Sequence, residues 1–236
     1  MRLDAYLFSN GFTSSRTRAS NLIKLGGVTV NGVKEYKPSY EVDKGDIVIV
    51  NDVIGYASLG GLKLAYALEH FPVDSLGVCV DLGSSNGGFC DVLLKREATK
   101  VYAVDIGDCA LPDHLRRDER IVVKDRTNAR NTDLPDCLAD TVTADLSFIS
   151  LTLVLPEVYR LLKKDGRAIL LIKPQFEVGK NGLTKTGIVK SEKIALKAVE
   201  NIKANANALG FNVIGVIPIQ KLFEDKNVEY LISLKK

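Results

Sequence analysis

Residues 77–108, GVCVDLGSSNGGFCDVLLKREATKVYAVDIGD, contain the pattern that decides the fold. The apolar run 78–80 ends in an acid, which is typical of a buried parallel strand. A loop with three glycines and an apolar helical stretch follow, and a second apolar run, 101–104, ends at Asp105. A strand, a glycine loop, a helix and a second strand ending in an acid together predict a nucleotide-binding unit.

The spacing within the glycine loop indicates which nucleotide binds. A dinucleotide fingerprint G-x-G-x-x-G starting at Gly83 requires a glycine where this chain has Ser85. Asp81, just before the loop, favours a cationic ligand over a phosphate. Asp105 lies 22 positions after Gly83, close to where an acid binds ribose hydroxyls in such folds. We therefore predict a loop for S-adenosylmethionine; the alternative is an ordinary turn with structural glycines.

Length and composition indicate a globular protein. The 236 residues leave room for one large domain, or for an ordinary domain and a small one. A hydrophobic content of 46% with 26% charged residues is normal for a chain with a full core. No apolar stretch approaches the roughly 20 residues that span a bilayer, and the N-terminus lacks the apolar block of a signal peptide. We predict a cytoplasmic protein.

The cysteines and histidines do not suggest a metal centre. The four cysteines show no C-x-x-C spacing, and the chain has two histidines. We therefore predict buried free thiols and no metal site.

The N-terminal segment is the basic part of the chain. Residues 1–37 carry six Lys or Arg and two acids, a net charge of +4, whereas the whole chain carries +3. Two short helices are predicted on either side of Gly11, followed by a hairpin, because Asn31-Gly32 between alternating valines is a strong two-residue turn signal. A basic piece on a nearly neutral body favours contact with a polyanion, and the alternative is a solvated cationic face.

Residues 1–50 resemble the S4-type RNA-binding domain. The resemblance rests on Arg2-Leu3-Asp4, on Ser15-Arg16-x-x-Ala19 and on Gly27-Val28-x-Val30-Asn31-Gly32. It implies that the second helix and the hairpin carry RNA, through contacts that depend on salt. The implied RNA-binding residues are Arg2, Arg16, Arg18, Lys24 and Lys34.

The rest of the chain continues the alternation of strands and helices. After a helix that begins at residue 59, we predict strands at 120–124, 141–144 and 167–172, helices from Leu153 to Leu162 and over 191–209, and a terminal hairpin of strands at 211–219 and 228–234. This order predicts an α/β fold, a Rossmann-like methyltransferase sheet that is mostly parallel and covered on both faces, with a small N-terminal α+β domain. Ligands of such sheets bind at the carboxyl ends of the strands.

Two consecutive strands end in residues suited to proton transfer. Asp145 and Lys173 should lie side by side near the glycine loop, since a lysine at a buried strand end needs an acid partner. A second cation, Lys63, would favour the neutral amine, the form that accepts a proton. Glu229, in the last strand, could orient that amine. The alternative is that these residues form structural ion pairs.

Lys63, Asp145, Lys173 and Glu229 occur in the order and contexts of the Lys-Asp-Lys-Glu tetrad of FtsJ-type RNA 2′-O-methyltransferases. Longer blocks are similar to the TlyA family, which joins an S4-type domain to such an enzyme. They are Gly60-Gly61-Leu62-Lys63-Leu64, Asp81-x-Gly83-x-Ser85-x-Gly87-Gly88-Phe89, Arg126-Thr127-Asn128, Asp145-x-Ser147-Phe148-Ile149-Ser150, Lys173-Pro174-Gln175-Phe176-Glu177 and Asn227-Val228-Glu229-Tyr230-Leu231.

This resemblance implies methyl transfer from S-adenosylmethionine to ribose 2′-hydroxyls of ribosomal RNA, with Lys173 as the base. It divides the chain into an RNA-binding domain (1–50), a linker (51–58) and a methyltransferase domain (59–236). The implied cofactor-binding residues are Asp81, Gly83, Ser84, Ser85, Gly87, Gly88, Phe89, Asp105, Asp125 and Asn128. Leu59, where the family usually has Arg, and the segment 220–226 depart from the family pattern.

Two other functions stay open at this point. Members of this family were labelled hemolysins, so a membrane-lysing protein is one alternative. The absence of a secretion signal and of a basic amphipathic interfacial helix argues against it. The other alternative is an RNA-binding protein whose methyltransferase site is inactive.

Overall fold

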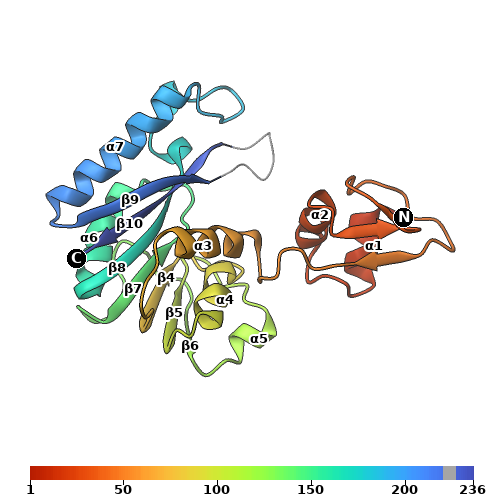
Figure 1. Ribbon diagram of the computed structural model, residues 1–236, viewed down its shortest axis with the longest axis horizontal. Helices are drawn as coiled ribbons and strands as arrows, with labels where there is room; N and C mark the ends of the chain where they lie inside the picture. The colour runs from red at the N-terminus through yellow and green to blue at the C-terminus, as the bar shows by residue number, and fades with distance from the viewer. Residues whose placement is uncertain (220–226) are drawn as a thin grey trace.

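The structure, a computed structural model, describes residues 1–219 and 227–236. Figure 1 shows a small N-terminal body of two helices and a short sheet, joined by one connecting segment to a larger body built on a second sheet. The chain therefore begins with a small α+β unit and continues into an α/β body with a mostly parallel sheet, which is the fold class predicted from the sequence. The division into domains at residues 50 and 59 stays a prediction.

The N-terminal body packs two helices on a three-stranded sheet of order β2-β1-β3. Its elements are α1 (Leu3–Ser9), α2 (Arg16–Lys24), β1 (Val28–Val30), β2 (Val33–Lys34) and β3 (Val48–Val50). Asn31 and Gly32 both adopt positive φ, 52° and 82°, as a tight hairpin turn requires. Ser15 caps α2 by accepting a hydrogen bond from the Arg18 backbone N–H.

A core of Leu3, Leu7, Leu22 and Ile23, all nearly inaccessible, holds this body together. The same core is contacted from outside by two leucines at the start of α3 (Leu59–His70), Leu59 and Leu62. Leu59, the residue that departs from the family pattern, therefore has an apolar contact here. The first turn of α3 packs against the N-terminal body. The buried face of the same helix packs into the core of the larger body.

The larger body is a seven-stranded sheet of order β6-β5-β4-β7-β8-β10-β9. The first five strands in this order are parallel, and β10 runs antiparallel to both of its neighbours. The strands are β4 (Val78–Leu82), β5 (Lys100–Val104), β6 (Ile121–Lys124), β7 (Ala139–Ala144), β8 (Leu162–Ile172), β9 (Asn212–Ile219) and β10 (Glu229–Lys235). The predicted terminal hairpin at the sheet edge is confirmed.

Helices cover both faces of this sheet, as the alternation of elements predicted. Since successive strand residues point to opposite faces, β4 places Val80 and Leu82 in one apolar core and Cys79 in the other. In Figure 1, α3 and α4 lie on one face and α6 and α7 on the other. The larger body's remaining helices are α4 (Gly88–Lys95), α5 (Asp113–Arg116), α6 (Leu155–Leu161), α7 (Glu192–Ala208) and the short turns η1 (Leu151–Leu153), η2 (Pro174–Phe176) and η3 (Lys180–Gly182).

One predicted boundary was wrong. The helix expected from Leu153 to Leu162 is a 3-10 turn followed by α6, and β8 already begins at Leu162. The polar run 163–166 resembles a helix end in sequence, but it forms the first part of β8. Leu162 pairs with Ala139 of β7 across an irregular register, and this pairing decides the strand start.

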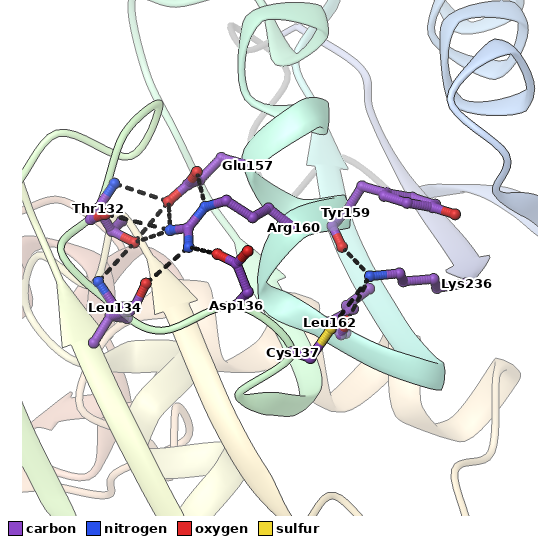
Figure 2. Close-up of polar contacts among 9 residues, drawn as sticks. All are labelled: Thr132, Leu134, Asp136, Cys137, Glu157, Tyr159, Arg160, Leu162 and Lys236. Carbon is purple, nitrogen blue, oxygen red and sulfur yellow. Dashed lines mark hydrogen bonds and ion pairs between the residues drawn. The ribbon is translucent and has the colours of Figure 1, made fainter.

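Near the start of β7, at the strand ends opposite the glycine loop, Arg160 of α6 holds the segment before β7 against the helix (Figure 2). Its guanidinium pairs with Glu157 at 2.6 Å and with Asp136 at 2.5 Å, and it donates to the Leu134 carbonyl oxygen at 2.8 Å. Glu157 is 5% exposed and also accepts from the Thr132 backbone N–H and hydroxyl. Arg160 thus fixes the chain just before it enters β7.

Candidate active site

The glycine loop brings the ends of β4, β5 and β7 together without a side chain between them. Gly83 has φ +86°, and a Cβ there would lie 2.8 Å from the Asp145 carbonyl oxygen at the end of β7. The Gly83 N–H donates to the Val104 carbonyl oxygen of β5 at 2.8 Å. Glycine at this position is therefore required both by its backbone conformation and by the close approach of β7.

A cavity of about 690 Å³ opens at the carboxyl edge of the sheet, beside this loop. Its volume falls in the range of small-molecule and cofactor sites. Asp105 lines it and accepts hydrogen bonds from the backbone N–H groups of Ser85 and Gly107, both at 2.9 Å. The cavity is lined by Gly83, Ser85, Asp105, Ile106, Asn128, Ala129, Arg130, Asp145, Leu146, Ser147, Phe148, Ile149, Ser150 and Leu153.

A smaller cavity of about 190 Å³ adjoins the first, since both are lined by Gly83, Ser85, Asp145 and Ser147. Its other walls come from Ser58, Gly60, Ser84, Gly88, Phe89 and Lys173. A Cβ on Gly60 would lie 3.5 Å from an Asp145 carboxylate oxygen, so glycine leaves the space in front of that carboxylate free. The two cavities form one site with an elongated shape.

The four residues of the predicted tetrad meet at this site, although they come from α3, β10 and the ends of β7 and β8. Lys173 Nζ lies 2.6 Å from Asp145 Oδ1 and donates to Ser147 Oγ at 2.9 Å. Lys63 Nζ lies 2.5 Å from Glu229 Oε2 and 4.0 Å from Asp145 Oδ2. Two cations and two anions in a partly buried cluster neutralise one another, which offsets the cost of their desolvation.

The pairing differs from the sequence expectation in one respect. Glu229 was expected to orient the amine of Lys173, but its carboxylate holds Lys63. Asp145 contacts both lysines and so links the two halves of the cluster. The reason is positional: β10 lies beyond β8 in the sheet, and its first residue, Glu229, reaches Lys63 in α3.

Seven of the ten expected cofactor residues line the two cavities: Gly83, Ser84, Ser85, Gly88, Phe89, Asp105 and Asn128. The other three do not line either cavity. Asp81 is fully buried, and Gly87 is the N-cap of α4, where a Cβ would meet Leu111 and Leu115. Asp125 is exposed and accepts from the Cys109 backbone N–H at 2.6 Å.

Phe148 is a site residue that the sequence-based expectations did not assign to a role. It is 91% exposed and has φ +63°, a conformation that a bulky residue adopts only when its surroundings impose it. Its ring lies 5.1 Å from that of Phe176, at the cavity wall. Glu177 fixes the adjoining turn by accepting from Ser150 Oγ and from the Leu151 N–H.

The five expected RNA-binding cations occupy different environments. Arg2 and Arg16 both pair with Asp4 at 3.0 Å while about half of each side chain stays exposed. Lys34 is exposed on β2. The Arg18 guanidinium instead donates to the carbonyl oxygens of Tyr56 and Ala57 and pairs with Asp52, so it binds the connecting segment. Lys24, in the last turn of α2, also interacts within the protein.

Over residues 1–219 and 227–236, no helix combines the length and the apolar character that crossing a bilayer requires.

The larger body matches the FtsJ-like methyltransferase family over residues 56–236, and the smaller matches the S4 domain over residues 1–48. The chain is 39% identical over 240 residues to the 16S/23S rRNA (cytidine-2'-O)-methyltransferase TlyA of Mycobacterium tuberculosis, a match that covers 99% of this chain and 89% of that one. It is 35% identical to Hemolysin A of Brachyspira hyodysenteriae, with 98% of each chain covered.

A solved structure, a putative hemolysin from Streptococcus thermophilus, superimposes with a TM-score of 0.77 at 34% identity. It covers all of this chain and 88% of the other. Family matches over both bodies and relatives aligned along nearly the full length lead to one assignment. The chain belongs to the TlyA/hemolysin A family, in which an S4 domain precedes an FtsJ-like methyltransferase.

Proposed function

We propose that this protein transfers a methyl group from S-adenosylmethionine to a ribose 2′-hydroxyl of ribosomal RNA. The observation that carries the proposal is the position of Lys173, whose Nζ lies 2.6 Å from Asp145 in the wall of the cavity next to the glycine loop. The relative from Mycobacterium tuberculosis, named as a cytidine-2'-O-methyltransferase of ribosomal RNA, supports the choice of acceptor.

The residues present fit the cofactor. Asp105 lies at the wall of the larger cavity, where it can accept from ribose hydroxyls, and Asn128 offers an amide to the adenine. Gly83 and Ser85 line both cavities and would contact the methionyl part of the cofactor. When bound, S-adenosylmethionine supplies an electrophilic methyl group on a sulfonium.

Lys173, a cation paired with Asp145 in the resting site, loses a proton to solvent and then acts as the base that accepts the proton of the ribose hydroxyl. Asp145 and Ser147 hold its nitrogen at two points, which orients the remaining lone pair and limits motion of the side chain. The methyl group that replaces this hydroxyl proton would come from S-adenosylmethionine held by Asp105 and the glycine loop. Lys63, fixed by Glu229, keeps Asp145 in place from its other side. By holding the hydroxyl in one orientation toward the cofactor site, these residues would supply much of the rate.

Phe148 offers a surface for the base of the target nucleotide. This almost fully exposed ring lines the same cavity as Asp145 and can stack on a base that has left its helix. Stacking on an aromatic side chain contributes about 1–3 kcal/mol per base. The S4 domain, with Arg2, Arg16 and Lys34 exposed, supplies contacts to the phosphate backbone. RNA therefore contacts both bodies of the protein.

The test compares wild type with Lys173→Met. Because general base catalysis contributes about 10²- to 10⁴-fold, we expect kcat for ribose methylation of unmodified ribosomal subunits to fall within that range. Isothermal titration with S-adenosylmethionine serves as the control and should give the same affinity for both proteins. Equal methylation by the two proteins, or methylation of a base in place of a ribose, would refute the proposal.

A further inference from the structure

The segment between β8 and α7 forms a basic loop, residues 178–191, which no expectation above assigned to a function. It contains Lys180, Lys185 and Lys190 and no Asp or Glu, so its net charge is +3. Residues 1–37 carry +4 and the whole chain +3, so the remaining 185 residues carry −4. The chain therefore has two cationic segments on a net acidic body, and the basic loop is one of them.

The basic loop has a defined conformation. Leu183 and Val189 form a β-bridge, and the Thr184 N–H donates to the Ile188 carbonyl oxygen at 2.7 Å. Gly187 closes the turn with φ +79°, and nothing lies within 4 Å of the position of a Cβ there. The tip of this turn exposes the Lys185 ammonium beside the hydroxyls of Thr184 and Thr186. Ammonium and hydroxyl groups are the donors that commonly contact phosphate oxygens.

The loop is attached to the catalytic elements at both ends. It begins five residues after Lys173, beyond η2. The Asn227 side chain, two positions before Glu229, accepts from the Val189 N–H at 2.8 Å and donates to the Gly187 carbonyl oxygen at 3.1 Å. Figure 1 shows the loop leading into α7 at the top of the larger body. The turn is thus held on the side of the sheet that carries the site.

We infer that the basic loop binds the phosphate backbone of the RNA substrate on the catalytic body, through Lys185 and Lys180. The inference rests on the proposed function for the identity of the polyanion. Among the described residues, the ammonium groups of Lys180 and Lys185 have no ion-pair partner, so contact with phosphate does not require breaking one. With the S4 domain contacting RNA elsewhere, this second contact fixes the orientation of the RNA strand across the site.

The test measures the affinity of the full chain for a fluorescein-labelled RNA stem-loop as a function of salt concentration. Each lost phosphate contact lowers the slope of log affinity against log salt by about 1. We expect Lys185→Gln to lower the slope by about 1 and the double variant Lys180→Gln/Lys185→Gln by about 2. The control is Lys164→Gln, an exposed lysine at the opposite end of β8, which should leave the slope unchanged.

In steady-state methylation, the double variant should raise KM for RNA and leave kcat at saturating RNA unchanged. Wild-type slope and KM in the double variant would overturn the inference, even with an active enzyme. If wild type methylated no ribose while the slope still fell, the loop contact would stand and the proposed function would fail. The two proposals are therefore tested separately.

Discussion

At the scale of single residues, Asp81 of the glycine-loop motif is buried and binds other side chains of the protein. Its carboxylate accepts from Thr143 Oγ1 at 2.8 Å and from Cys90 Sγ at 3.2 Å, and none of it is exposed. Burial nevertheless raises the pKa of this carboxyl to about 6, since desolvation outweighs these two hydrogen bonds. Asp81 therefore holds β4 against β7 beneath the glycine loop through a carboxylate that is not exposed.

This raised pKa predicts a specific pH dependence of stability. The folded-state pKa, about 6, lies above the usual 3.8, so the folded chain binds the proton more tightly. Its contribution favours folding below about pH 4 and is lost as pH rises to about 6, a change of up to about 3 kcal/mol. Asp81→Asn removes this titration. Urea unfolding at several pH values should show the wild type losing stability relative to the variant over this range; parallel profiles would contradict the prediction.

At the scale of elements, the contact between α6 and the segment before β7 is built on Glu157 and Arg160. The two side chains pair with each other within α6 and together bind Thr132, Leu134 and Asp136. Glu157 is nearly inaccessible and Arg160 is its charged partner (Figure 2). Removing one member of a buried pair leaves the other charge uncompensated, which costs about 3–5 kcal/mol. Because Arg160 is partly exposed, we expect the lower end of that range.

Arg160→Met should therefore lower the free energy of unfolding by about 3 kcal/mol. The double variant Arg160→Met/Glu157→Met should recover part of the loss, because no unpaired buried charge remains. Chemical denaturation of the four proteins in this cycle provides the measurement. A double variant as unstable as the sum of the two single variants would show that the pair is not coupled.

At the scale of the whole molecule, Arg18 and Lys34, both expected from the sequence to bind RNA, lie in different environments. Arg18 joins α2 to the connecting segment through two carbonyl oxygens and Asp52, whereas Lys34 is exposed. Leu59 and Leu62 add apolar contacts between α3 and the N-terminal core. The two bodies are thus joined by packing as well as by the chain.

We expect Arg18→Ala to lower the free energy of unfolding by about 1–3 kcal/mol, since hydrogen bonds from a charged donor are lost. Hydrogen exchange at the amides of residues 52–58 should become faster in this variant. Lys34→Ala should leave the free energy of unfolding and these exchange rates unchanged. It should lower the slope of log RNA affinity against log salt by about 1. A larger loss of RNA affinity from Arg18→Ala than from Lys34→Ala, at unchanged stability, would return Arg18 to the RNA-binding surface.

The elements themselves followed from local patterns. The strand–loop–helix–strand unit at 77–108 and the hairpin at Asn31-Gly32 were predictable because period and turn chemistry are local properties. The start of β8 was not, because the polar run 163–166 becomes a strand only through pairing with β7. Phe148 was missed for a similar reason, since its exposure is set by the turn that Glu177 holds.

The sequence by itself determined the fold class, the family and the identity of the four residues that meet at the site. Asp145 and Lys173 were predictable because strand ends of a parallel sheet gather at one edge. Lys63 and Glu229 were predictable from the order and context of the Lys-Asp-Lys-Glu tetrad. Only the tertiary structure decided how those four residues pair, that Glu229 holds Lys63, that Asp81 turns inward and that Arg18 binds the connecting segment. These outcomes depend on distances between elements far apart in the chain, and a local pattern of residues does not contain them.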